Sequence, residues 1–295
     1  MGVMVSGIAQ AAEVFIAGGS SVTKWDTGTN TTSTVFNTPF GLDSLIFDAH
    51  GNLITSRISA NQLGIFNGTT DSTLAALGLG TVADMALEPG GTTLLVGNFT
   101  GTTIQRVNAS TGVVSATALN VGARPDGIAY DNSGNLFVVV GRKSVARVDP
   151  TTGAILQTLT LLTATGAVTG NADGLSFDST TGMLYVSNDD SSGNGGYWIV
   201  PTNLSTQTLI DLHLDIDGNA ADGNTLYLIQ RGVRGVQVDL ATNTVTLLSP
   251  VISGADDIAP LAGLGSQQPV PEPATLALLA FALAGMGLAR RRERN

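Results

Sequence analysis

The sequence predicts an all-β protein, a β-propeller of six four-stranded antiparallel blades. A unit of 40 to 47 residues recurs along the chain, and within each unit short apolar runs are separated by Asp, Asn and Gly. These runs are rich in β-branched and aromatic residues and lack the 3.6-residue spacing of helices. Of the 23 acidic residues 19 are Asp, which favours turns and strand ends over helices.

The repeat is clearest in the stretch PDGIAYDNSGNLFVVV, residues 125–140. Each copy starts with an aspartate ahead of an apolar run, and successive starts lie 41, 42, 47, 44 and 40 residues apart: Asp43, Asp84, Asp126, Asp173, Asp217 and Asp257. Periods of this length are typical of propeller blades or helical repeats, and the short strand-like runs favour blades.

Each unit contains four predicted strands. After the Asp-start strand come a second strand such as Leu-Phe-Val at 136–138, a third such as 144–148 and a fourth such as 155–159. The last two are joined by a turn, DPTTG at 149–153, in which glycine supplies a positive φ. Four antiparallel strands per repeat make one blade.

The sixth blade is predicted to combine both ends of the domain. Only one strand, residues 257–261, follows the last Asp start, whereas three strand-like runs precede the first: 14–17, 21–25 and 33–36. Joining them pairs both open edges of the ring. We therefore expect the propeller to occupy residues 13–264.

Composition excludes several functions. The net charge is −10, only 13 of 295 residues are basic, and four of those lie in the last six positions. No basic stripe is available to contact phosphates, so nucleic-acid binding is not expected. Cysteine is absent, which excludes disulfides, a thiolate nucleophile and a Cys-ligated metal.

The C-terminal residues are predicted to be a segment that directs where the protein is delivered. A Pro271-Glu272-Pro273 box precedes an uncharged run at 274–289 and a basic cluster that includes Arg290, Arg291 and Arg292. Sixteen residues as a helix span about 24 Å, a short membrane crossing whose arginines stay cytoplasmic. We expect a linker at 265–273, then a short hydrophobic transmembrane sorting helix with its basic tail at 274–295.

This arrangement resembles the PEP-CTERM sorting signal of Gram-negative bacteria that make extracellular polysaccharide. The resemblance implies an exosortase as a partner, a precursor anchored in the inner membrane through the C-terminal helix, and final location in the cell envelope or extracellular matrix. Residues 1–12, which end in an A-x-A pattern at 9–11, are then interpreted as a partial signal peptide. The alternative is an ordinary first strand.

The Asp starts are predicted to ring one mouth of the central channel, because first strands of propeller blades line it. Residues at the ends of second strands join them there: Asn98, Asn188, Arg57, Arg142 and Arg231. A second set of acids falls at the opposite face, where carboxylates can cap turn amides: Asp48, Glu88, Asp131, Asp178 and Asp222.

The Asp-Gly starts resemble those of NHL-type and gluconolactonase/regucalcin-type six-bladed propellers. In the latter family a divalent ion sits in the channel mouth, so the resemblance implies a Ca²⁺ or other divalent-cation site at Asp126, Asp173 and Asn188. The match is partial, since no Glu begins a blade here. The alternative is that these groups bind backbone amides or arginines. Alternating polar residues at 211–219 are a further cation candidate.

Two functions remain open. The first is a non-enzymatic envelope or matrix protein whose propeller is a scaffold for polysaccharide or a surface protein. This reading is favoured because the sequence contains no G-x-S-x-G elbow, P-loop or His-rich zinc cluster. The second is a metal-dependent hydrolase of lactones or similar esters, in which the ion polarises the carbonyl and a mouth carboxylate acts as base.

Overall fold

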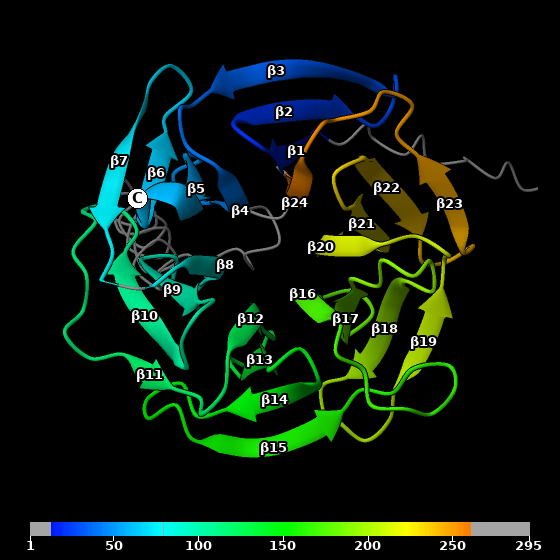
Figure 1. Cartoon of the computed structure of the whole chain (residues 1–295). Coiled ribbons are helices and arrows are strands. Elements are labelled where there is room, and N and C mark those ends of the chain that lie inside the picture. The colour runs from blue at the N-terminus through cyan, green and yellow to red at the C-terminus, as the bar shows by residue number, and fades with distance from the viewer. Residues whose placement is uncertain (1–12, 79, 261–295) are drawn as a thin grey trace, which may run out of the picture. The chain divides into compact units, whose positions relative to one another are not determined.

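The computed structural model describes residues 13–78 and 80–260, which form six four-stranded antiparallel sheets around a central axis (Figure 1). The predicted signal peptide at 1–12, linker at 265–273 and sorting helix at 274–295 lie outside the described residues. Within the described part of the chain, no helix has the length and hydrophobicity that a membrane crossing needs. The all-β, six-bladed prediction is confirmed.

Blade numbers follow the chain order, and the strands of each blade run from the inner edge of the ring outward. Blade 1 contains β4 (Leu42–Phe47), β5 (Leu53–Arg57), β6 (Gln62–Phe66) and β7 (Asp71–Ala76), with a short 3-10 helix η1 (Ile58–Ala60). Blade 2 contains β8 (Val82–Leu87), β9 (Thr93–Asn98), β10 (Thr103–Asn108) and β11 (Leu119–Asn120). Blade 3 contains β12 (Pro125–Tyr130), β13 (Leu136–Val140), β14 (Ser144–Val148) and β15 (Ile155–Thr160).

The second half of the ring repeats this order. Blade 4 contains β16 (Ala172–Asp178), β17 (Met183–Asn188), β18 (Gly196–Pro201) and β19 (Thr208–Asp211). Blade 5 contains β20 (Ile216–Asp222), β21 (Thr225–Gln230), β22 (Arg234–Asp239) and β23 (Thr244–Leu247). Blade 6 contains β24 (Ala255–Pro260), β1 (Glu13–Gly18), β2 (Ser21–Asp26) and β3 (Thr31–Asn37).

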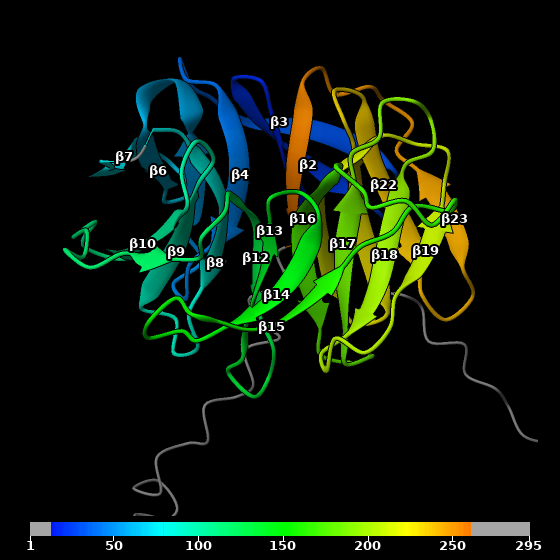
Figure 2. The ribbon, with the colours of Figure 1, turned by 60° about the horizontal axis from the view of Figure 1, so that its bottom comes forward.

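Blade 6 closes the ring as predicted, with one strand from the C-terminal side and three from the N-terminal side. β24 pairs antiparallel with β1, and Ile258 lies directly opposite Ile16. Both side chains are buried, at 2% and 0% exposure. In Figure 2 the orange β24 stands among the strands of the N-terminal blue segment, as this pairing requires.

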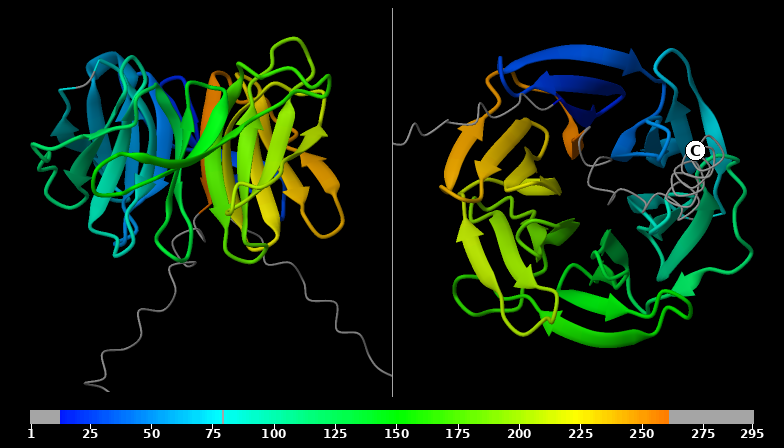
Figure 3. Two further views of the ribbon diagram at one scale, coloured as in Figure 1. Left: turned by 90° about the horizontal axis from the view of Figure 1, so that it is seen from below. Right: turned by 180° about the vertical axis from the view of Figure 1, so that it is seen from behind.

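The core lies between adjacent blades. Second strands such as β13 (LFVVV) are buried at every position, because each face of the sheet packs against a neighbouring blade. Outer strands such as β15 alternate between exposed and partly buried positions. At the junction of blades 5 and 6, the rings of Trp25 and Tyr227 pack edge to face, with their centroids 6.4 Å apart. The blades stand side by side around the axis (Figure 3), so every large face is covered.

Every inner strand carries a β-bulge near its first residue. In blade 3, Pro125 is opposite Val140 and Ile128 is opposite Val138, so Asp126 and Gly127 together face one partner residue. The same irregularity occurs at the equivalent place in the other five inner strands. A bulge redirects the side chains that it contains, and here it determines what enters the channel.

Candidate functional site

A cavity of about 260 Å³ opens at the end of the channel where the inner strands begin. We call this end the mouth face and the opposite end the turn face. All six predicted aspartates line the cavity, together with Asp256, which sequence reasoning missed. The lining also includes two arginines and a few apolar residues: Arg142, Arg231, Ile58, Val82, Ala83 and Phe99.

The bulge separates these aspartates into two structural positions, and two of them lie one residue later than the repeat implies. The first bulge position is occupied by Asp43, Ala83, Asp126, Asp173, Asp217 and Asp256. Asp84 and Asp257 occupy the second position. The aspartate equivalent to the other blade starts in blade 6 is therefore Asp256, and blade 2 has none.

The second bulge position contacts the inner strand of the next blade. The Asp84 carboxylate accepts a hydrogen bond from the Ile128 amide of blade 3 at 3.0 Å, and Asp257 accepts one from the Leu45 amide of blade 1 at 3.2 Å. The Ser44 hydroxyl of blade 1 donates to Asp84 at 3.1 Å. These side chains tie three successive junctions of the ring.

At the other three junctions the second bulge position is glycine, and the backbone itself makes the approach. A Cβ added to Gly127 would lie 2.4 Å from the Leu175 nitrogen of blade 4. At Gly218 it would lie 2.3 Å from the Asp257 carboxylate. The glycine of the Asp-Gly repeat is thus required by the packing of one blade on the next.

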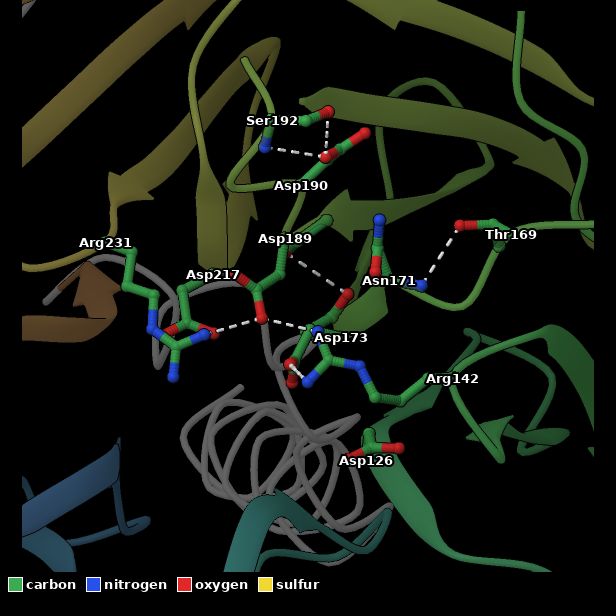
Figure 4. Close-up of polar contacts among 12 residues, drawn as sticks. Asp126, Arg142, Thr169, Asn171, Asp173, Asp189, Asp190, Ser192, Asp217 and Arg231 are labelled. Atoms are coloured by element: carbon green, nitrogen blue, oxygen red, sulfur yellow. Dashed lines mark hydrogen bonds and ion pairs between the residues drawn. The ribbon is translucent and has the colours of Figure 1, made fainter. Parts of the chain in front are cut away.

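An arginine cluster occupies one side of the mouth. Arg231 and Arg142 reach the buried Asp189 carboxylate from two sides, Arg231 through Nη1 at 2.7 Å (Figure 4). Arg142 Nη1 also lies 3.1 Å from an Asp173 oxygen, and Arg231 Nε lies 3.6 Å from Asp217. Burial alone raises the pKa of Asp189, but hydrogen bonds from Asp215 and Arg142 and the charge of Arg231 outweigh it and lower the pKa below its ordinary value.

The cluster does not fit the divalent ion that the family resemblance implies. Ligand oxygens of Asp173, Asp189 and Asp217 lie within 4.8 Å of one another, a spacing suited to a metal. The two guanidinium groups already supply positive charge and hydrogen bonds to these oxygens. A cation there would have to displace both, so the donor set is built for arginine rather than for Ca²⁺.

The predicted metal residues do not converge. Of the three, only Asp173 belongs to the close trio. Asp126 pairs through Oδ1 with Arg124 at 2.5 Å. The Asn188 amide nitrogen donates to the Asn194 carbonyl at 3.1 Å. Asp189 replaces them, and the only sequence signal for it was its position directly after the end of a second strand.

Three carboxyls at the mouth have a raised pKa. Within the described residues Asp43 makes no hydrogen bond or ion pair, and burial together with the charges of Asp173 and Asp217 raises its pKa to about 8. Burial raises the pKa of Asp126 to about 6, against the charge of Arg124. The Asp217 carboxyl contacts that of Asp256, and burial with this contact raises the pKa of Asp217 to about 9.

Two further residues placed at the mouth by the sequence lie elsewhere. Asn98 does not line the cavity and accepts hydrogen bonds from the Thr100 amide at 3.2 Å and its hydroxyl at 3.3 Å, which caps the turn after β9. Arg57 runs outward across its own sheet to Asp71 in the outermost strand, at 2.5 Å. A side chain at a strand end can turn toward either the channel or the rim, and the sequence does not distinguish the two.

The turn face uses its acids as predicted in three blades. Asp131 accepts hydrogen bonds from the amides of Ser133 and Asn135, both at 2.9 Å. Asp48 and Asp178 cap their turns in the same way. Glu88 departs from this prediction and pairs with Arg106 at 2.8 Å.

The segment at 211–219 does not present its polar groups on one face. β19 ends at Asp211, which accepts the His213 amide at 2.8 Å in a turn where His213 has φ of +55°. Asp215 and Asp217 instead contact Asp189 and Asp256. These contacts remove the alternation on which the cation prediction depended.

Comparison with known families identifies the C-terminal segment as a sorting motif. Residues 269–292 match the model described as the PEP-CTERM protein-sorting motif. The chain carries this sorting motif. It implies an exported protein with a membrane-anchored precursor that an exosortase processes, as the sequence predicted. The match covers the C-terminal motif and does not extend to the propeller.

The propeller is similar to several solved structures. A chain of a nidogen/laminin complex gives a TM-score of 0.69 at 16% identity, over 85% of this chain and 98% of that one. A streptogramin B lyase gives 0.59 at 15%, over 80% and 78%. A virginiamycin B lyase from Staphylococcus aureus gives 0.55 at 13%, over 70% and 69%. At these identities the likeness concerns the fold alone, and no curated protein matches the sequence.

Proposed function

We propose that this chain is an exported, non-enzymatic binding scaffold of the cell envelope or extracellular matrix. Its C-terminal motif delivers it, and its propeller presents the acidic mouth to a polysaccharide or a surface protein. The observation that carries the proposal is the combination of a sorting motif at 269–292 with a solvent-accessible cavity lined by carboxyls from all six blades.

Rigidity supports a scaffold role. Side-chain hydrogen bonds at the bulges join the inner strands at three junctions of the ring, and close glycine approaches join them at the other three, so the wall of the cavity is held from all six blades. A preformed site loses little conformational entropy on binding. The lining carboxyls accept hydrogen bonds and attract positive charge, which suits a ligand rich in hydroxyl or ammonium groups.

A hydrolase is the alternative, and the arginine cluster argues against it. A metal-dependent lactonase needs an ion with an open coordination position. The one carboxylate trio with metal spacing in the described chain is hydrogen-bonded to Arg142 and Arg231. The lyase activity named for two of the similar structures belongs to those proteins.

Localisation and processing are tested together in a host that makes an exosortase. We expect the full chain in the envelope or matrix fraction, with mass spectrometry showing loss of residues after the Pro271-Glu272-Pro273 box. Deleting residues 270–295 should release a folded propeller. An envelope protein that still ends at Asn295 would contradict processing, and absence from envelope and matrix would contradict the scaffold role.

Activity is tested with the purified protein on a lactone panel with Ca²⁺, Mg²⁺, Mn²⁺ and Zn²⁺. We expect no hydrolysis above the buffer rate. A metal-dependent rate that is lost in Asp173→Asn but kept in the surface variant Glu13→Gln would replace the scaffold proposal with the hydrolase.

A further inference from the structure

Much of the acidity of the mouth is left without a counter-charge. Both cavity arginines are engaged by Asp173, Asp189 and Asp217. The remaining cavity carboxyls come from blades 1, 2, 3 and 6: Asp43, Asp84, Asp126, Asp256 and Asp257. Among the described residues, only Asp126 of these five forms an ion pair.

Asp126 supplies a second, independent sign of a ligand. The residue is 2% exposed and lines the cavity. Its Oδ1 is held by Arg124, but its Oδ2 is buried without any hydrogen-bond partner. A buried acceptor of this kind is unfavourable unless a donor reaches it. In Figure 4 Asp126 lies apart from the dashed contacts that join Arg142, Asp189 and Arg231.

These carboxyls do not have the spacing of a bare metal site. In the described chain, the arginine-bound trio is the one acidic group whose ligand atoms lie within 4.8 Å of one another. The cavity of about 260 Å³ holds several water-sized volumes of about 30 Å³ each. A ligand that fills this cavity is therefore larger than a naked ion.

The lining also contains apolar surface, which an organic ligand uses and a hydrated ion does not. Phe99 is 37% exposed at the cavity, and the Arg124 guanidinium carbon lies 3.3 Å from the centre of its ring. Ile58 lines the same cavity from blade 1. Carboxyls beside apolar carbon suit an organic cation.

We infer that the mouth binds an amino sugar that carries a free ammonium group, presented by a cationic polysaccharide. This inference rests on the proposed scaffold function and names its ligand class. A lysine head offers three donors and no more, whereas an amino sugar adds hydroxyl donors around the ring and carbon–hydrogen faces for Phe99 and Ile58. Acceptors that converge from several blades match the sugar better.

Calorimetry on the full chain in detergent tests this directly. The probes are a glucosamine oligosaccharide, with free amines, and the N-acetylated oligosaccharide of the same length. We expect the amine form to bind at least tenfold more tightly. Equal affinity for both forms would overturn the inference, because the ammonium group would then contribute nothing.

Matched variants locate the site. Asp43→Asn and Asp256→Asn each replace one cavity carboxyl that can ionise beside an ammonium group with an amide that cannot, at little change of shape. Glu13→Gln replaces a surface carboxyl on β1 as the control. We expect at least fivefold weaker binding of the amine probe in each cavity variant and less than a twofold change in the control. Thermal melting of every variant shows whether it is folded. Amine binding that survives in both folded cavity variants would overturn the assignment.

Two further probes separate competing ligands. If Ca²⁺, added as CaCl₂, binds and neither oligosaccharide binds, the mouth is an ion site and the inference fails. If an oligolysine peptide binds as tightly as the amine sugar, the ligand is a protein and the inference also fails. In both cases the scaffold function survives. It fails separately if neither isolated matrix polysaccharide nor surface protein binds the full chain.

Discussion

Aspartates at the two faces of the propeller meet opposite environments. On the mouth face, burial and neighbouring carboxyls raise the pKa of Asp43 to about 8 and that of Asp217, which contacts Asp256, to about 9. On the turn face, hydrogen bonds from the Thr152 and Thr151 amides lower the pKa of Asp149 below its ordinary value, and the Thr242 amide acts in the same way on Asp239. One residue type serves two purposes.

This difference shows that the local backbone determines whether the ionised or the protonated form of each carboxyl is favoured. A turn presents amide groups that stabilise the ionised form. The channel collects carboxyls from six strands, and the arginines there neutralise only some of them. The turn face is therefore complete without a ligand, whereas the mouth face has unused capacity for protons or a cation.

The largest effect is expected from removing the closing strands. Deleting residues 13–37 takes β1, β2 and β3 from blade 6 and leaves β24 and the junction with blade 1 open. Both faces should be lost together, since unpaired edges aggregate. Size exclusion and circular dichroism should show an aggregated or molten product. A soluble, cooperatively melting protein would contradict the closure.

Glycine substitutions compare the packing of the two faces. Gly127→Ala at the mouth puts a methyl group 2.4 Å from the backbone of blade 4, and we expect a loss of about 3 kcal/mol in unfolding free energy. Gly134→Ala in a turn meets no atom within 4 Å but keeps a φ of +78°, for about 1 kcal/mol. Urea unfolding measures both. Equal losses would mean that blade-to-blade contact at the bulge is unimportant.

A cap on the turn face should contribute a moderate amount. Asp131→Ala removes hydrogen bonds to two amides and one side-chain amide, at 2.9, 2.9 and 2.7 Å. We expect about 1–2 kcal/mol of destabilisation at neutral pH. Chemical denaturation at pH 7 tests this, and Asp131→Asn should recover part of the loss. No measurable loss would show that the caps are dispensable.

Replacing a mouth carboxyl should have an effect of the opposite sign, a stabilisation that is present only at high pH. Because the pKa of Asp43 is about 8 in the folded state and 3.8 for an unperturbed aspartate, the folded protein holds the extra proton between these pH values, and stability falls as pH rises through them. Asp84, Asp173, Asp217 and Arg124 face this group. Asp43→Asn should match the wild type at pH 4 and be about 1–2 kcal/mol more stable at pH 9, a range discounted for solvent screening. A variant less stable at pH 9 would contradict this account.

The sequence predicted the architecture well because the repeat is local. Turn residues and apolar runs recur in every blade, so the unit, its four strands and the closing of blade 6 followed from spacing alone. The bulge limited what could be said of the site. It places Asp84 and Asp257 one position later than Asp126, so Asp256 was overlooked.

The sequence did not predict which arginine pairs with which aspartate, for a different reason. Asp189 collects Arg142 and Arg231 from two other blades, 47 and 42 residues away. Arg57 and Arg142 both follow the apolar run of a second strand, yet Arg57 turns to the rim and Arg142 to the channel. Side-chain direction depends on packing between blades, which spacing does not encode.

The central claim is that Asp43 at the mouth keeps its proton at pH values where Asp149 on the turn face is ionised. A carbon-13 NMR titration of aspartate side-chain carboxyls, assigned with Asp43→Asn and Asp149→Asn, measures this most directly. The account predicts a midpoint for Asp43 near pH 8 and one for Asp149 below 3.8. It also predicts that a bound ammonium ligand lowers the Asp43 midpoint. An Asp43 carboxyl that titrates near pH 4 without ligand would contradict the account.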